Sequence, residues 1–285
     1  MTTNQTSAKN DRAKKKGILN LLARWIDLLI DPILRPIFGF LEYIGQLALL
    51  ILQTLWFLIT LRINFAQAIQ QMSHLGTDSL FIVTLCLGFT GMILSTILTQ
   101  QALEIGFGIE YIGGVVVYSF AKDLAPVLAG LIMAGRVGAG IASEIGTMKV
   151  TDQIDALRAL AVPPVRHLVV PRLLACAVMV PVITIIAGFA GVWLGWLPVH
   201  LMPAAHISYR IYFDGVFSML TERLLKITFT KSFCFGITIA LIACLEGFMT
   251  KGGARGVGVT VTRAVVISMV CIFIVDLILT FLMPW

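Results

Sequence analysis

Charged residues are scarce in this sequence. Asp, Glu, Lys and Arg together make up 13% of the 285 residues, whereas hydrophobic residues make up 58%. Soluble domains carry about 25% charged residues, and a surface with so few charges cannot face water on all sides. Lipid must therefore cover much of the chain. We expect an all-α membrane protein whose apolar segments form one membrane domain.

The sequence also lacks the motifs of several enzyme classes. No Gly is followed directly by Lys, which excludes a phosphate-binding P-loop, and no His-Glu-x-x-His pattern occurs. The acidic residues are too dispersed for a paired-carboxylate site, and no Cys-x-x-Cys pair exists. The His residues are scattered in flanking loops, so we interpret them as interfacial side chains rather than metal ligands. The Cys residues lie in apolar runs, which favours buried free thiols over disulfides. We expect no catalytic site and no metal site.

The net charge of +6 does not indicate nucleic-acid binding, because most basic residues flank the apolar segments. Residues 1–17 are expected to form a disordered basic cytoplasmic tail with no secretory signal. A cluster of basic residues in this tail either lies near anionic lipid headgroups or is solvated and has no function. The cluster consists of Arg12, Lys14, Lys15 and Lys16.

Residues 18–78 are expected to form interfacial or elbow helices. The segment 18–34 is amphipathic, which predicts a helix in the plane of the interface. The segment 40–61 is apolar enough to span the bilayer, with Glu42 its only charge. It either remains embedded without crossing or forms an inserted hairpin with 18–38.

Five clearer spans follow within a predicted membrane domain, 79–285. They are expected at 79–103, 111–135, 173–199, 232–249 and 264–283.

The positions of Lys and Arg predict the orientation. The loops 136–172 and 250–263 are basic and should be cytoplasmic, whereas the loop 104–110 has no basic residue and should face outside. This arrangement places the amino end inside and the carboxyl end outside. It also places 200–231 outside despite the four basic residues of that segment.

Small residues recur every fourth position before the long basic loop. This spacing brings them onto one helix face, which permits close packing either within the chain or against a second subunit. They are Ala134, Gly138, Ala142 and Gly146.

A short amphipathic helix is predicted at about 150–162. Thr151 can cap it, Asp152 and Asp155 complement the positive end of its dipole, and the Pro163–Pro164 pair ends it. Such a helix either docks into a groove of a partner or lies flat on the headgroups.

The run AGRVGAGIASEIGTMKVTDQIDAL, followed by AVPPVRHLVVPR, resembles the MlaE/YrbE family of permeases. These permeases belong to ABC transporters that work with MCE proteins. The resemblance is strongest over 118–175 and extends more weakly over 79–285. The residues in register are Gly135-Arg136, Glu144-Ile145-Gly146, Met148, Gln153 and Pro171-Arg172.

The resemblance implies a homodimer in the bacterial inner membrane that moves phospholipids or related lipids and supports outer-membrane lipid asymmetry. It implies a separate ABC ATPase that binds ATP and Mg, so no cofactor is expected in this chain. The other implied partners are a hexameric MCE protein and a small STAS-domain protein. The cytoplasmic loop would hold the coupling helix, with ATPase-coupling residues Glu144, Met148, Lys149, Asp152, Gln153, Asp155 and Arg158.

The resemblance also singles out charged residues inside the spans. Lys122 and Asp123 match a basic–acidic pair of the second span, although the family usually has Glu where this chain has Asp123. Lys231 and Asp276 match charges of the fourth and fifth spans. Lys122, Asp123 and Lys231 either contact a lipid headgroup or gate its passage, or they form structural ion pairs. For Asp276 we expect internal hydrogen bonding.

Two other functions fit a polytopic membrane protein. An ion-coupled secondary transporter would show inverted repeats, and no duplicated pattern is evident in the sequence. A non-transporting membrane scaffold would bind the ATPase without turnover that depends on lipid.

Overall fold

The computed structural model describes residues 38–60, 65–106, 108–203 and 207–283, which are helical with short connections and contain no strand. The all-α membrane fold is confirmed. The expected tail and the amphipathic segment 18–34 lie outside the described residues. The described residues up to Leu49 and those from Leu50 onward belong to separate compact units.

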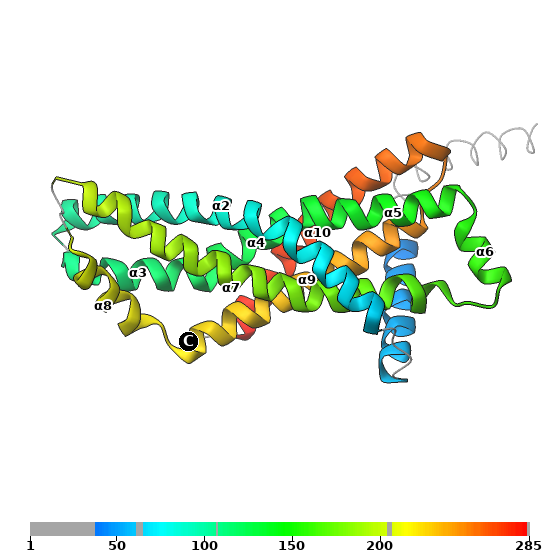
Figure 1. Ribbon diagram of the computed structural model, residues 1–285, viewed down its shortest axis with the longest axis horizontal. Coiled ribbons are helices and arrows are strands. Elements are labelled where there is room, and N and C mark those ends of the chain that lie inside the picture. The colour runs from blue at the N-terminus through cyan, green and yellow to red at the C-terminus, as the bar shows by residue number, and fades with distance from the viewer. Residues whose placement is uncertain (1–37, 61–64, 107, 204–206, 284–285) are drawn as a thin grey trace, which may run out of the picture. The chain divides into compact units, whose positions relative to one another are not determined.

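Helices and helical turns follow one another closely in the larger unit (Figure 1). In chain order they are α2 Phe65–Ile105, η1 Ile109–Tyr111, α3 Ile112–Ser119, η2 Phe120–Leu124, α4 Ala125–Met133, η3 Ala134–Gly138, α5 Ala139–Val150, α6 Gln153–Ala159, η4 Val165–Val169, α7 Val170–Leu201, α8 Tyr209–Met219, α9 Glu222–Phe248 and α10 Gly253–Leu282.

Six helical segments of the described chain are long and apolar enough to cross a membrane. Five correspond to the predicted spans. The sixth is the helix Phe38–Ile59, so residues 40–59 of the segment predicted at 40–61 belong to a continuous helix of spanning length.

The helices extend beyond the predicted spans. Helix α2 begins at Phe65 rather than at 79, α9 begins at Glu222 rather than at 232, and α10 begins at Gly253 rather than at 264. The predicted spans ended at charged residues, but charges interrupt only the apolar run and not the backbone hydrogen bonding of a helix. Long charged side chains at the end of a span can reach the interface.

The second span contains two wide π-helical turns, η2 and η3. Pro126 is the second residue after η2, in the first turn of α4. Proline has no N–H for the ordinary bond to the residue four positions earlier, so the backbone is rearranged around it. The turn η2 contains Lys122 and Asp123, and η3 contains Arg136.

Glycines permit the contact between α2 and α7. A Cβ atom on Gly91 would lie only 2.1 Å from the carbonyl oxygen of Gly191. Because neither residue has a side chain, the two backbones touch at this crossing. Helix α10 is different, since its outer face exposes large apolar side chains that lipid or another protein must cover.

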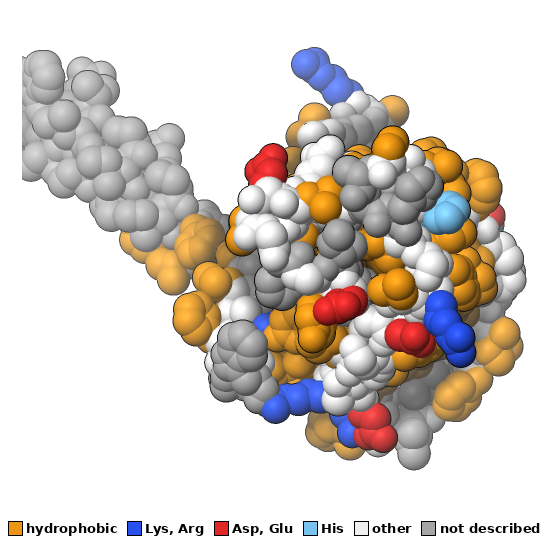
Figure 2. Space-filling view, turned by 90° about the vertical axis from the view of Figure 1, so that its left-hand side faces the viewer, with side chains coloured by type: hydrophobic (Ala, Val, Ile, Leu, Met, Phe, Trp, Pro, Cys, Tyr) orange, Lys and Arg blue, Asp and Glu red, His pale blue; other side chains and the backbone are white. Residues whose placement is uncertain are grey.

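The connections gather at two ends of this unit. Figure 1 shows α6 and the turn between α9 and α10 at one end, and the α2–α3 and α7–α8 connections at the other. The two predicted cytoplasmic loops therefore share an end. Figure 2 views the opposite end, where the described charged side chains are scattered among apolar ones. Helix α8 lies there, with Tyr212 and Val216 buried.

Candidate coupling and transport sites

Lys231 is buried among three helical segments. Its Nζ atom lies 2.5 Å from Oδ1 of Asp123, 2.9 Å from Oδ1 of Asp276 and 2.9 Å from the hydroxyl of Thr280, and the residue is 1% exposed. A buried ammonium is tolerated only when it is paired. The Asp123–Lys231–Asp276 cluster therefore connects η2, α9 and α10.

Lys122 has a different neighbour from Asp123. Its Nζ atom donates to the hydroxyl of Tyr118 over 3.1 Å and lies 5.1 Å from the centroid of that ring. Adjacent residues on a helix do not share a face. The structure therefore brings together Asp123 and Lys231 of the predicted lipid-contacting residues and directs Lys122 to a separate contact.

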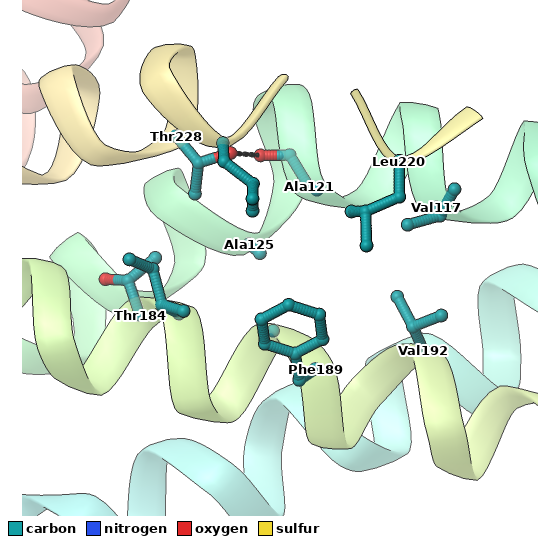
Figure 3. Close-up of a pocket in the computed structure, with 11 residues that line it drawn as sticks. Val117, Ala121, Ala125, Thr184, Phe189, Val192, Leu220 and Thr228 are labelled. Atoms are coloured by element: carbon teal, nitrogen blue, oxygen red, sulfur yellow. Dashed lines mark hydrogen bonds between the residues drawn. The ribbon is translucent and has the colours of Figure 1, made fainter. Parts of the chain in front are cut away.

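An apolar pocket lies between the second span, α7 and the start of α9 (Figure 3). Val117 and Val192 lie on opposite walls, and the hydroxyl of Thr228 donates to the carbonyl of Ala121 over 2.6 Å. Its free volume is about 30 Å³. Pockets for drug-sized ligands measure roughly 300 Å³ or more, so this pocket does not accommodate a phospholipid in the conformation described.

The predicted short helix is present as α6, held by an ion-pair network. Lys149 Nζ lies 3.1 Å from one Asp155 oxygen, and Arg158 Nη1 lies 3.0 Å from the other. The hydrogen bond from Lys149 is the main cause that lowers the pKa of the Asp155 carboxyl below its ordinary value. Ile154 is buried and anchors α6, whereas Gln153 is exposed.

The predicted ends of this helix are wrong. The Thr151 hydroxyl donates back to the carbonyl of Thr147 over 2.9 Å instead of capping α6, and the N-cap is Asp152, with a φ of 58°. At the other end the helix stops before the prolines. Leu160 is the C-cap, and Ala161 turns the chain away with a φ of 57°. The positive φ of Asp152 is tolerated because Asp adopts the left-handed region more readily than most residues.

Glu144 lies at the base of this connection. Its Oε2 atom is 2.8 Å from Nη2 of Arg172, and Nη1 of the same guanidinium donates to the carbonyl of Leu168 over 3.0 Å. Arg172 was in register with the family motif, but no role was predicted for it. Met148, one turn beyond Glu144, is half-buried on α5.

The four small residues pack within the chain. Gly138 faces Ile239 of α9, and Gly146 faces Thr250 and Val257 beside the α9–α10 turn. Ala134 and Ala142 are fully buried. Intrachain packing accounts for this stripe, and its role in a subunit contact stays a prediction.

Thr280 was missed because its hydroxyl carries no motif in the sequence. It follows Asp276 by one helical turn, so helical spacing could have suggested a shared face.

Comparisons with known proteins identify the family. The family model described as Permease MlaE matches residues 68–282. A probable ABC transporter permease protein of Synechocystis sp. is 39% identical over 241 residues, which cover 84% of this chain and 87% of that protein.

Two further relatives come from distant sources. A probable ABC transporter permease protein of Rickettsia prowazekii is 38% identical over 213 residues, covering 74% of this chain and 81% of that protein. The Arabidopsis thaliana protein TRIGALACTOSYLDIACYLGLYCEROL 1, chloroplastic, is 34% identical over 220 residues, covering 77% of this chain and 62% of that protein. With its six candidate spans, the chain is a multi-pass membrane protein that belongs to the MlaE permease family of ABC transporters.

Proposed function

We propose that this permease moves phospholipids or related lipids between the bacterial inner membrane and a hexameric MCE protein. Two copies would form the transport path, and a separate ATPase would bind ATP and Mg. A STAS-domain protein would join the ATPase. The Arabidopsis relative supports a lipid substrate, because its name contains that of a galactolipid.

The geometry of α6 is the observation that carries the proposal. This helix is short, it is stiffened by the Lys149–Asp155–Arg158 network, and it protrudes at the end of the unit where both basic loops lie. Beside it Leu160 is 74% exposed. An exposed apolar side chain next to a rigid charged helix is well suited to insertion into a groove of a partner.

The surface of the chain supports a dimer with a lipid chamber. Helix α10 exposes apolar side chains along its length, including Phe273 and Leu277. The pocket of Figure 3 is too small for a lipid, so a chamber of adequate size needs surface from a second copy or an opened conformation. Asp123 is half exposed and would let a headgroup approach the buried Lys231.

Charge reversal on α6 tests the coupling role. The double variant Asp155→Arg and Arg158→Asp should lose co-purification of the ATPase and its stimulation by the permease. The matched control exchanges Glu222 and Lys226, an exposed pair 3.3 Å apart at the start of α9, and should retain both. Unchanged stimulation in the α6 variant would refute the coupling role, and retained binding without lipid-dependent turnover would favour a scaffold.

A further inference from the structure

A second cavity lies between the first half of α2 and the η3–α5 segment. It has a volume of about 330 Å³, within the range of about 300–1,000 Å³ that is typical of small-molecule sites. Six of the ten residues that line it have polar or charged side chains, whereas the pocket of Figure 3 is lined almost entirely by apolar ones. Gly140 forms part of its wall, and a Cβ atom at this position would meet no atom within 4 Å.

A buried hydroxyl faces this cavity. Ser79 is 1% exposed, it lines the cavity, and its Oγ atom has no hydrogen-bond partner within the described part of the chain. Two other hydroxyls of α2, those of Thr77 and Thr99, donate to backbone carbonyls one turn earlier. A buried hydroxyl without a partner is costly, so Ser79 is suited to bind a polar ligand group.

The cavity is lined by charged side chains of both signs. Asp78 Oδ2 lies 3.0 Å from Nδ1 of His74 and 4.0 Å from Nη2 of Arg136. On the far wall, Glu144 pairs with Arg172 at 2.8 Å. The cavity lining therefore presents two carboxylates and the Arg136 guanidinium, while Arg172 pairs with Glu144 without lining the cavity. Groups of both signs favour a ligand that carries a positive and a negative group over one with a single charge.

The cavity lies where the apolar part of each wall ends. Asp78 directly precedes the uncharged stretch 79–103, and Arg136 directly follows the uncharged stretch 124–135. Charged residues at the end of a membrane span usually lie at the depth of the lipid headgroups. The cavity between Asp78 and Arg136 is therefore expected at that depth.

An apolar stripe continues from the cavity along α2. Ile82, Leu85, Phe89 and Ile93 follow Asp78 at spacings of three or four residues, so they share its face of the helix. Their side chains are between 41% and 59% exposed. A polar cavity at headgroup depth therefore opens onto an apolar surface that runs toward the middle of the bilayer.

The geometry points to a binding site for a zwitterionic phospholipid at this cavity, separate from the Asp123–Lys231–Asp276 cluster. Arg136 and the Ser79 hydroxyl bind the phosphate, Asp78 and Glu144 bind the ammonium, and the acyl chains lie along the stripe. The site is defined by binding alone, so it does not require that the lipid bound there is the one transported.

The test uses the purified full-length protein without ATPase, in nanodiscs containing a phosphatidylethanolamine with a photoreactive acyl chain. Crosslinks are mapped by peptide mass spectrometry. We expect labelling at 82–93 that falls about tenfold in Gly140→Leu, which fills the cavity without a backbone clash, a change equivalent to about 1.4 kcal/mol of binding free energy. The control Gly258→Leu, also an exposed helical glycine with no atom within 4 Å of its Cβ, should label normally.

Further arms identify the chemistry of the ligand. Ser79→Ala, which preserves the helix, should weaken labelling, and a phosphatidylglycerol probe, which has no ammonium, should label 82–93 less than the ethanolamine probe. Equal labelling by both probes, full labelling of Gly140→Leu, or displacement of the lipid probe by soluble glycerophosphoethanolamine would each overturn the proposal. A failure of ATPase coupling would leave these measurements unchanged, so the two proposals fail separately.

Discussion

Arg172 and Glu144 join the two helices that flank the proposed coupling segment. The guanidinium at the start of α7 is nearly fully buried, and it reaches 2.8 Å to the carboxylate on α5. The connection that contains α6 leaves α5 and returns through η4 to α7. In the proposed coupling, a displacement of α6 would therefore be transmitted to both spans together.

Loss of this ion pair should uncouple hydrolysis from transport. In Glu144→Gln the ATPase should still bind, because α6 and its network are intact, but transport per ATP hydrolysed should fall about tenfold, which corresponds to the loss of roughly 1.4 kcal/mol of coupling. Reconstituted liposomes with paired transport and hydrolysis assays measure the ratio. The control is Glu222→Gln, which removes the charge from one partner of an exposed ion pair on α9. A wild-type ratio in Glu144→Gln would show that the pair is merely structural.

The buried cluster should dominate the stability of the α9–α10 region. Lys231→Met leaves the largely buried Asp276 without its cation, and removal of one partner of a buried pair costs about 3–5 kcal/mol. Lys226→Met removes an exposed pair, which is worth roughly 0–1 kcal/mol. Thermal unfolding in detergent should separate the two variants clearly. Equal unfolding midpoints would contradict a buried, paired Lys231.

Neutralising the acidic partners should restore part of this loss. The triple variant Asp123→Asn, Lys231→Met and Asp276→Asn has no charge in the cluster, so it should unfold at a higher temperature than Lys231→Met alone.

The α2–α7 crossing should tolerate no side chain. Gly91→Val would place its Cβ atom against the carbonyl of Gly191, and overpacking of this kind costs about 1–3 kcal/mol or more. We expect a lowered unfolding midpoint and weak expression. Gly258→Val, whose Cβ would meet open space, should change neither. Normal stability of the Gly91 variant would place the two helices farther apart.

The α6 network should weaken in acid. The pKa of Asp155 is lowered from 3.8, so its contribution is complete above that value and is lost as the pH falls through the lower pKa of the folded protein. Lys149→Met should raise the pKa of Asp155 toward 3.8, whereas Lys226→Met should not. Carbon-13 NMR titration of labelled Asp side chains measures this shift, and an unchanged pKa in Lys149→Met would exclude the pair.

The sequence predicted the spans well, because apolar runs require lipid or burial. It placed their ends badly in α9, where Glu222, Arg223 and Lys226 belong to the first turns of the helix. It found Asp123 and Lys231 but not their pairing, because the two residues are 108 positions apart and only the tertiary fold decides which charges meet.

The sequence did not predict the second cavity. Its walls come from α2 and from η3–α5, and each contributes ordinary residues such as Ser79 and Gly140. No local pattern marks a serine whose hydroxyl lacks a partner, since that property depends on the packing around it. The polar face of α2 before 79 was expected to be part of an interfacial segment, whereas it continues the first span of this unit.

Contact between α6 and the ATPase is the central claim, and crosslinking tests it most directly. A photoreactive amino acid at Leu160, in the reconstituted complex, should crosslink to the ATPase with an efficiency that changes when ATP binds. The same probe at Phe217, exposed on α8 at the other end, should not crosslink to it. Capture of the ATPase from Phe217 and not from Leu160 would place α6 on the side of the membrane without nucleotide and would contradict the account.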